Sequence, residues 1–399
     1  MQLPILPTTL LALAPTAFAL QSPPQARSVW SDPDLAGASE VEAGDFDGDG
    51  LLDLAASSYY DDVFVWYRQL PGNQFSRHTI FPINTAFDIG SADFDGDGDL
   101  DLYGSSLSTS EYGEDTVWWF ENQLSKTQDP DAGFSPQLLF SFPNQDPRAM
   151  DAADFDGDGH VDLAVAFVYD EHIHLFLNPT GRGPQSPPVL VPVPNVNGVS
   201  VVEGVDFDAD GDVDLLAGTA WNSSFGVNIY WYENYGAGVF GPRVPIAGGS
   251  EFAGMFALEA ADMDGDGWMD VVATHDGTYG APFVRWIRRL DAAGGQWSAP
   301  KVVDPLFFGA DSDQCLEAVD LDLDGDVDIV GGSTLVDRKL RAWFNDGRGN
   351  FRPYDLEVGL GAHGITAADF NGDGRPELAT AEWGECCYTG GVRLWALDF

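Results

Sequence analysis

A nine-residue, Asp-rich segment recurs seven times along this chain, and the repeat limits the folds that the chain can adopt. The first copy runs Asp45-Phe-Asp47-Gly-Asp49-Gly-Leu-Leu-Asp53, with acids at positions 1, 3, 5 and 9 and glycine at position 6. The other copies start at Asp93, Asp154, Asp206, Asp262, Asp320 and Asp369. Starts that lie 48 to 61 residues apart are typical of one small β-sheet per unit.

Each copy is embedded in the same pattern of short strands. A small-residue segment such as 254–261 precedes the motif, and an apolar pair such as Leu52 and Leu54 follows it. A later strand carries a large side chain at a matching place: Trp66, Trp119, Trp231, Trp286, Trp343 and Trp395, with Leu175 in the third unit. Turn residues separate these strands and helical periodicity is absent. The sequence therefore predicts an all-β, seven-bladed propeller with a DxDxDGxxD loop in each blade.

The two ends of the chain complement one another. The last unit stops at its third strand, residues 392–399, and a segment that resembles a fourth strand stands at residues 26–31. We expect this N-terminal strand to complete the last blade, because closure removes the open sheet edges of the ring. An open solenoid would instead require polar capping units at both ends, and the sequence shows none.

The Asp loops are candidate calcium sites. Alternate residues of a tight loop point the same way, so the acids at positions 1, 3 and 5 converge, and the carbonyl of position 7 and the acid of position 9 complete the set. Ligands that are all oxygen suit calcium and disfavour zinc. Plain polar turns are the alternative, but clustered carboxylates repel one another without a cation. An EF-hand is excluded because position 12 of the first loop is Ala56, within a strand, and not a Glu.

We expect about seven Ca²⁺ ions, one for each loop, and a structural role for them. The predicted ligands of the first four loops are Asp45, Asp47, Asp49, Leu51 and Asp53; Asp93, Asp95, Asp97, Asp99 and Asp101; Asp154, Asp156, Asp158, His160 and Asp162; and Asp206, Asp208, Asp210, Asp212 and Asp214. Those of the last three are Asp262, Asp264, Asp266, Trp268 and Asp270; Asp320, Asp322, Asp324, Asp326 and Asp328; and Asp369, Asn371, Asp373, Arg375 and Glu377. The sixth loop departs from the pattern at Leu323, and the seventh at Asn371 and Glu377.

Charge and the N-terminal segment limit the partners and the location. The chain carries 64 acids against 18 bases, a formal charge of −46, so nucleic acid is not expected as a partner. Residues 1–19 are mostly apolar and end in Ala17-Phe-Ala19, which predicts a signal peptide, a secreted protein and a single propeller over 20–399. No later segment has the length of a membrane span, and we expect a monomer.

The motif D-F-D-G-D-G-x-x-D-L, together with the strands Trp119-Phe-Glu-Asn122 and Trp231-Tyr-Glu-Asn234, resembles the FG-GAP/VCBS repeat family. Similar propellers form the head of integrin α subunits and occur in secreted adhesion proteins, lectins and some polysaccharide lyases. The resemblance implies that the Asp loops join the first and second strands of each blade and lie on the face opposite the ligand. The number of loops resembles microbial-style arrays more than integrin heads.

Loops on the opposite face are rich in aromatic and acidic residues, a combination that suits sugar binding. The candidate ligand-binding residues are Tyr59, Tyr60, Tyr112, Tyr169, His172, Trp221, His275, Tyr279 and Trp383. We expect an adhesion or recognition module for a glycan or an extracellular protein. The alternative is a carbohydrate-active enzyme of the polysaccharide lyase kind. No catalytic residue is assigned, because the sequence shows no paired base and charge stabiliser and no known nucleophile motif.

Three further features are left open by the sequence. The residues three before each motif are Glu42, Gly90, Asp151, Glu203, Glu259, Glu317 and Thr366. They predict an acidic axial channel, either a solvated pore, which we favour, or a cation site. A disulfide from Cys315 to Cys386 or Cys387 is one hypothesis, and a Cys386–Cys387 bridge is the alternative. Asn222 is a candidate N-glycosylation site.

Overall fold

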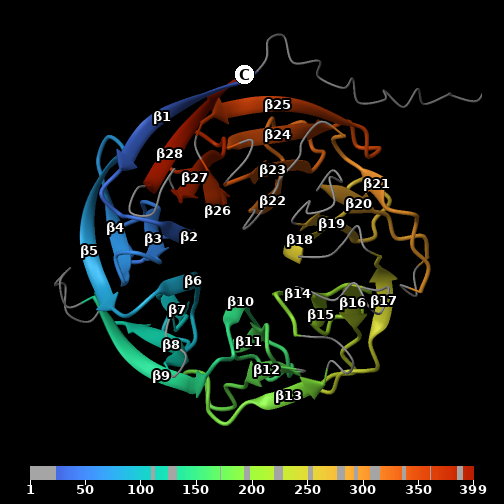
Figure 1. The fold of residues 1–399 in the computed structure, drawn as a ribbon, viewed down its shortest axis with the longest axis horizontal. Helices are drawn as coiled ribbons and strands as arrows, with labels where there is room; N and C mark the ends of the chain where they lie inside the picture. Colours follow the sequence, from blue (N-terminus) through green and yellow to red (C-terminus); the bar gives the residue numbers. More distant parts are fainter. Residues whose placement is uncertain are drawn as a thin grey trace, which may run out of the picture.

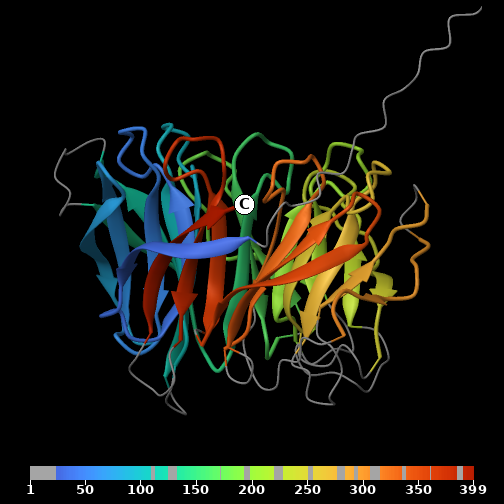
Figure 2. The same cartoon turned by 90° about the horizontal axis from the view of Figure 1, so that it is seen from above.

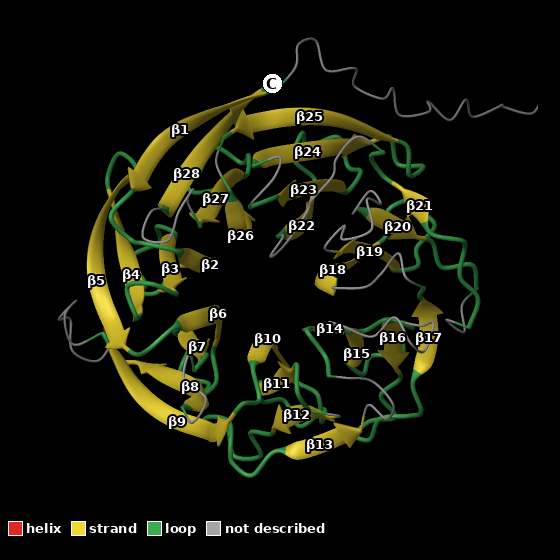
Figure 3. Ribbon diagram, viewed as in Figure 1, coloured by secondary structure: helices red, strands yellow, loops and turns green. Residues whose placement is uncertain are grey.

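The computed structural model describes residues 24–108, 113–124, 133–170, 172–192, 198–219, 228–249, 255–275, 284–291, 295–305, 315–334, 338–359, 361–383 and 390–399. They form seven antiparallel, four-stranded sheets arranged as blades around a central axis (Figure 1). Strands joined by loops make up this part of the chain (Figure 3). The prediction of an all-β, seven-bladed propeller is confirmed.

The blades are numbered by the order of their innermost strands along the chain. Blades one to three contain β2 (Ala38–Gly44), β3 (Asp53–Ser58), β4 (Val63–Leu70) and β5 (Gln74–Pro82); β6 (Ala86–Ala92), β7 (Asp101–Ser106), β8 (Glu114–Asn122) and β9 (Phe134–Pro143); and β10 (Pro147–Ala153), β11 (Asp162–Phe167), β12 (His172–Phe176) and β13 (Val189–Pro192). Blades four to six contain β14 (Val201–Val205), β15 (Asp214–Gly218), β16 (Ile229–Tyr232) and β17 (Val244–Ala247); β18 (Met255–Ala261), β19 (Asp270–His275), β20 (Arg285–Ile287) and β21 (Lys301–Val302); and β22 (Leu316–Val319), β23 (Asp328–Gly332), β24 (Lys339–Asn345) and β25 (Phe351–Val358).

Blade seven combines the two ends of the described chain. It contains β26 (Ala362–Ala368), β27 (Glu377–Glu382) and β28 (Gly391–Asp398), and β1 (Gln25–Asp32) pairs with β28 as its outermost strand (Figure 1). Trp30 of β1 also packs on blade one, with ring centroids 5.1 Å from Tyr67 and 4.7 Å from Phe75. The strand β1 therefore belongs to blade seven and also packs against blade one.

Every innermost strand leads into an Asp motif, and position 9 of that motif is the first residue of the second strand in each blade. The strands run between the two faces of the ring (Figure 2). Because the chain leaves each innermost strand in the same direction, all seven Asp loops lie on one face. The loops that join second and third strands lie on the other face.

The core lies between the blades. Seven clusters of buried apolar side chains are present, and each combines two neighbouring blades; Leu54 and Val65 of blade one, for example, pack with Ala379 and Leu394 of blade seven. Position 2 of every Asp motif enters one of these clusters: Phe46, Phe94, Phe155, Phe207, Met263, Leu321 and Phe370. All seven are at most 3% exposed. Each Asp loop is thus attached to an interface between blades by its second residue.

The structure corrects one part of the repeat alignment. Trp66 lies opposite Ala55, two residues after position 9 of its motif. Trp343 lies opposite Ile329, one residue after position 9, and Trp395 has the same register in blade seven. Side chains alternate between the faces of a sheet, so Trp343 and Trp395 point to the opposite side from Trp66. The six tryptophans do not occupy one equivalent place.

Candidate metal loops, axial channel and ligand face

The seven Asp loops share one hydrogen bond from a backbone N–H to a side-chain oxygen. In each loop the N–H of position 6 donates to Oδ2 of position 1, over 2.8 to 3.1 Å. The first and last examples are Gly50 to Asp45 and Gly374 to Asp369. A carboxylate that accepts the N–H of its own loop fixes the turn. The repeat in sequence is therefore a repeat in geometry.

Two left-handed residues shape each loop. Positions 4 and 6 have positive φ in all seven copies, as at Gly48 (71°) and Gly50 (87°). At position 6 the residue is always glycine, which adopts this conformation without a steric cost. At position 4, Ala209 and Leu323 have φ of 62°. This left-handed conformation is sterically unfavourable for a residue with a Cβ atom. The exceptional Leu323 therefore does not change the course of the sixth loop.

Carboxylate oxygens converge within the loops. The ligand atoms of each of these triads lie within 4.8 Å of one another: Asp45, Asp47 and Asp53; Asp93, Asp95 and Asp97; Asp154, Asp156 and Asp162; Asp206, Asp208 and Asp210; and Asp262, Asp264 and Asp270. Three loop oxygens, Asp45 Oδ1, Asp264 Oδ1 and Asp322 Oδ1, are buried with no hydrogen-bond partner. Oxygen-only donors at this spacing, with buried atoms left over, fit a hard cation such as calcium.

The acid at position 9 is the most buried of the acids in each loop. Asp53 is fully buried, and its Oδ1 accepts the backbone N–H of Gln69 at 2.7 Å while its Oδ2 accepts Trp66 Nε1 at 3.2 Å. Burial raises the pKa of Asp53 to about 7, although the Gln69 N–H opposes this shift. Burial likewise raises the pKa of Asp328 to about 8. The loops hold carboxylates in places where negative charge is costly unless it is compensated.

In six of the seven blades, a residue at the end of the third strand or just beyond it connects the Asp loop to the preceding blade, and we term this set the clasp residues. They are Gln69, Asn122, Asn178, Asn234, Arg289 and Asn345. Asn234 shows the pattern: its N–H donates to Asp214 Oδ1 at 2.7 Å, and its Nδ2 donates to the carbonyl oxygens of Phe155 and Val213, both at 2.8 Å. Phe155 is position 2 of the preceding Asp motif. The clasp residues couple neighbouring loops around the ring.

The sequence analysis did not assign a role to the clasp residues. Their signal was present in the Trp-aromatic-Glu-Asn strands, where Asn122 and Asn234 recur at one place. The role itself depends on the docking of two blades, which a single unit does not display.

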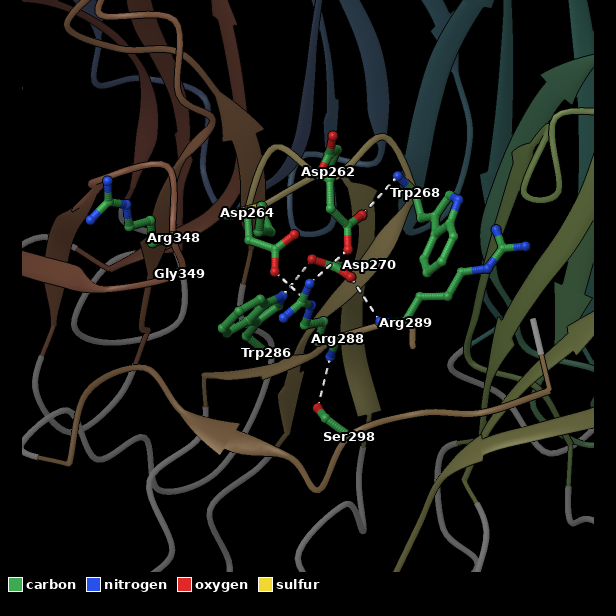
Figure 4. Close-up of polar contacts among 12 residues, drawn as sticks. Asp262, Asp264, Trp268, Asp270, Trp286, Arg288, Arg289, Ser298, Arg348 and Gly349 are labelled. Carbon is green, nitrogen blue, oxygen red and sulfur yellow. Dashed lines mark hydrogen bonds and ion pairs between the residues drawn. The ribbon is translucent and has the colours of Figure 1, made fainter. Parts of the chain in front are cut away.

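Arginine adds positive charge to two of the loops. In blade five, Arg288 Nε lies 2.6 Å from Asp264 Oδ2 (Figure 4). Arg288 Nη2 lies 2.8 Å from Asp266 Oδ2. Arg68 makes the same pair of contacts to Asp47 and Asp49 in blade one. In these two loops, an arginine of the protein compensates part of the negative charge of the carboxylates.

The seventh loop differs in its donors. Asn371 Nδ2 donates to Asp373 Oδ2 at 3.1 Å and also to Glu377 Oε1. An amide thus stands where the other loops have a carboxylate, and it satisfies two neighbouring acids. This loop keeps the shared fold with less uncompensated charge than the others.

The opposite face brings some of the predicted ligand-binding residues together. Tyr59, Tyr60 and Trp383 form a cluster with ring centroids 5.1 to 5.3 Å apart, at the junction of blades one and seven. His363 stacks on Trp383 at 4.9 Å, and Phe87 meets His363 edge-on at 5.7 Å. We term these five residues the aromatic cluster. The sequence analysis placed neither His363 nor Phe87 among the ligand-binding candidates.

A second group lies in blade three, apart from the aromatic cluster. Tyr169 is 67% exposed, and His172 Nδ1 lies 2.7 Å from Asp170 Oδ1. His174 Nε2 contacts the other oxygen of Asp170 at 3.1 Å. Burial alone would raise the pKa of Asp170, but the hydrogen bonds from His172 and His174 lower it overall.

Several predicted residues are not placed by the structure. Tyr112, Trp221, Asn222, Tyr279, Cys386 and Cys387 lie outside the described residues, as does the predicted signal segment 1–19. The backbone of His275 ends β19, and its side chain is not described. Cys315 is buried and has no disulfide within the described part of the chain. Within the same residues, no helix has the length and apolar character to cross a membrane.

The seven positions three residues before the motifs line one axial cavity of about 480 Å³. Its acids are Glu40, Glu42, Asp88, Asp151, Glu203, Glu259 and Glu317, so Glu40 and Asp88 add to those expected from spacing. Gly90 interrupts the series because the Tyr103 hydroxyl fills its place, 2.2 Å from where a Cβ would stand. The predicted acidic channel is present.

Several channel acids tie one blade to the next. Asp151 Oδ2 accepts the N–H of Gly204 at 2.6 Å, and Glu203 Oε1 accepts the N–H of Ala260 at 3.1 Å. These N–H groups belong to innermost strands, whose inner edges lack a partner strand. Burial raises the pKa of Glu203 and of Glu317 to about 8. In either protonation state, these carboxyl groups link neighbouring blades around the axis.

Comparisons with known proteins agree with this architecture. The chain resembles the solved structure of an Agrocybe aegerita lectin that specifically recognises non-reducing terminal N-acetylglucosamine. The TM-score is 0.52 and the identity 18%, and the match covers 84% of this chain and 81% of the lectin chain. It also resembles BBS1N from its complex with ARL6DN, with a TM-score of 0.55, 12% identity, and coverage of 94% and 97%. At these identities the likeness concerns the fold alone. No curated protein sequence matches the chain.

The fold and the recurring loops define a β-propeller built from Asp-loop blades. The FG-GAP-like repeat family matches residues 45–104, 154–217, 206–273 and 320–380, which together span more than half of the chain. The chain belongs to the FG-GAP-like repeat family, as the motif in its sequence indicated.

Proposed function

We propose that this chain is a secreted, calcium-stabilised propeller that recognises a glycan or protein ligand on the face opposite its Asp loops. The observation that carries the calcium part is the convergence of carboxylate oxygens in loops of one construction, with buried oxygens such as Asp45 Oδ1 left without a partner. Each loop would hold one Ca²⁺ through positions 1, 3, 5 and 9 and the carbonyl of position 7. The bound ion supplies the positive charge that lets these carboxylates lie together.

Metal analysis tests the calcium assignment. Protein dialysed against calcium and then freed of excess ion should retain about seven Ca²⁺ per chain by mass spectrometry, one for each loop. Asp264→Asn should lower the count by one, because Asp264 has a buried oxygen without a partner. The matched control is Asp34→Asn, an exposed acid outside the loops. Retention of no alkaline-earth ion would contradict the assignment.

The recognition part is supported by the aromatic cluster and by the likeness to a lectin that recognises N-acetylglucosamine. Aromatic ring faces pack on the CH surfaces of sugars, and neighbouring acids accept hydrogen bonds from hydroxyl groups. A glycan array should give binding that Trp383→Ala abolishes. Tyr235→Ala is the control, because Tyr235 is 58% exposed and lies near the Asp-loop face. Equal binding by both variants would remove the aromatic cluster from the ligand site.

A carbohydrate-active enzyme is the second candidate. It is favoured by one observation, the carboxylate of Asp170 that contacts both His172 and His174, because acid–base chemistry uses such oriented histidines. Incubation with acidic polysaccharides and ultraviolet detection of new unsaturated ends tests it. Turnover that is lost in His172→Ala would support a lyase, and glycan binding without turnover would favour the recognition module.

Secretion and ring closure are part of the proposal. N-terminal sequencing of the exported protein should begin near Leu20 if residues 1–19 are removed. We also propose that β1 keeps the ring closed in solution, because it pairs with β28 and packs on blade one. Deletion of residues 24–32 should then raise the hydrodynamic radius or the tendency to aggregate.

A further inference from the structure

We propose that the axial cavity binds a primary ammonium group of an organic cation, such as a free polyamine or an amino sugar. This inference deepens the proposed recognition function and rests on it for the face from which the ligand approaches. The cavity is about 480 Å³, which lies in the range of small-molecule sites and is large compared with the roughly 30 Å³ that one water occupies.

The lining of the cavity is strongly acidic in composition. Seven carboxyl side chains from six blades border it, and Arg148 is the one arginine or lysine among the described residues that do so. Arg148 has its own contacts, with Asp146 Oδ1 at 3.1 Å and with the ring of Phe87 at 5.5 Å. The cavity therefore carries more acid than the protein itself compensates, and it selects for positive charge.

Two carboxylate oxygens in this cavity are buried without a hydrogen-bond partner. They are Glu203 Oε2 and Asp88 Oδ2. The other oxygen of Glu203 accepts the N–H of Ala260, so the side chain is held in place with one acceptor left over. An ammonium group has three donors and would satisfy such acceptors by charge-assisted hydrogen bonds. The orphaned oxygens thus point to a donor that carries positive charge.

The placement of the acids favours an organic cation over a bare metal ion. Calcium requires six to eight oxygens at about 2.3–2.6 Å, which demands convergence of the side chains. In the channel, Asp151 and Glu203 come from different blades, and each is tied to the innermost strand of the following blade. A ring of spaced acceptors around a wide cavity suits ammonium groups on a carbon skeleton.

The aromatic cluster provides the second half of the site. His363 and Phe87 line the same cavity, and His363 stacks on Trp383. They belong to the starts of β26 and β6, on the side away from the Asp loops. Ring faces attract cations and pack on carbon skeletons. A ligand with an ammonium head in the channel would place its remaining atoms against these rings.

Isothermal titration of the calcium-saturated full chain tests the inference with three probes. They are spermidine, a β-linked glucosamine hexamer, and the N-acetylated form of the same hexamer. We expect an amine probe to bind, and Glu203→Gln combined with Glu259→Gln to weaken that binding at least tenfold. Asp34→Asn is the matched control and should not change the affinity. Circular dichroism and the calcium content show whether the double variant retains its fold.

The outcomes distinguish a free polyamine from an amino sugar, and they distinguish failure of the ammonium site from failure of the proposed glycan recognition. Binding of spermidine alone indicates a free polyamine, and binding of the glucosamine hexamer indicates an amino sugar. Equal binding of both hexamers, unchanged in the double variant, would overturn the ammonium site and leave glycan recognition standing. If neither amine probe binds, the inference is overturned. It is also overturned if the wild type binds one more Ca²⁺ than the double variant, because the channel acids would then hold a metal ion.

Discussion

The Asp-loop face and the axial channel both concentrate carboxylates, but the chain arranges them in opposite ways. In a loop the acids come from one short segment, and oxygens such as those of Asp45, Asp47 and Asp53 lie within 4.8 Å of one another. In the channel the acids come from different blades, and Asp151 and Glu203 are each held by the N–H of the following blade. The turn within each Asp loop brings its carboxylates together, whereas the ring of blades holds the channel carboxylates apart.

This difference separates two roles for the same functional group. Converging carboxylates form the sites that we propose for calcium, and their geometry repeats because each is encoded within nine residues. Distributed carboxylates join innermost strands and line a cavity. The two regions should therefore respond to different perturbations, and the four predictions below are arranged to test that separation, from the largest expected effect to the smallest.

Chelation of calcium should have the largest effect, and the effect should come from the loops alone. At free calcium about tenfold above Kd each site adds roughly 1.4 kcal/mol, so seven additive sites approach ~10 kcal/mol. This is comparable with the ~5–15 kcal/mol of a whole domain. Calorimetry with and without chelator measures the change. The double variant Glu203→Gln and Glu259→Gln should lose as much as the wild type, and an unchanged wild-type transition would refute a structural role for calcium.

Loss of a clasp residue should weaken the coupling between neighbouring loops. Asn234→Ala removes the donor to the Phe155 and Val213 carbonyl oxygens, two buried acceptors, and should cost about 2–4 kcal/mol in urea unfolding. Asn350→Ala is the control, because Asn350 is exposed and its side chain donates hydrogen bonds to Asp346 within the same turn. If both variants lose the same stability, the clasp does not link the blades as described.

The channel should give a pH dependence that the calcium-saturated loops lack. Burial raises the pKa of Glu203 and Glu317 to about 8 from 4.5, so the folded state retains protons that the unfolded chain has lost. Stability should therefore fall as the pH rises from about 4.5 to about 8. Glu203→Gln with Glu317→Gln should flatten this slope and add about 1–3 kcal/mol near pH 8. Urea titrations in saturating calcium measure it, and a wild-type slope in the variant would contradict it.

The smallest effect concerns backbone strain within one loop. Leu323 has φ of 62° and is 49% exposed, so Leu323→Gly should relieve strain with little loss of packing and stabilise the protein by up to ~1 kcal/mol. Leu138→Gly, at an exposed position in β9, should destabilise it instead. Thermal melts compare the two. Destabilisation by Leu323→Gly would mean that the leucine side chain contributes more than its backbone conformation costs.

Much of the fold follows from residues that act within one unit. The Asp motif predicted the loop, and the apolar residues after it predicted the second strand, because turn and strand preferences are local. The tryptophan alignment was wrong at Trp343 and Trp395, since a shift of one residue reverses the side of a strand and the spacing alone does not reveal it. Their partners, Asp304 for Trp343 and Thr380 for Trp395, differ accordingly.

Features that join two units were harder to foresee. The channel acids at spacing three were predicted, but Glu40 and Asp88 were not, although a strand period of two places Glu40 beside Glu42 and Asp88 beside Gly90. The aromatic cluster combines residues from both ends of the chain, Tyr59 and Trp383. Such contacts depend on how the ring closes, which no single repeat encodes.

The pairing of β1 with β28 also sets the timing of assembly. A ribosome adds about 5–20 residues per second, so β1 waits roughly twenty seconds or longer before its partner strand is made. Its sequence, with five polar residues among eight, is suited to that delay. An interrupted chain would lack β28 and expose unpaired strand edges, which cellular quality control can detect. The last blade is therefore complete only once β28 has been made.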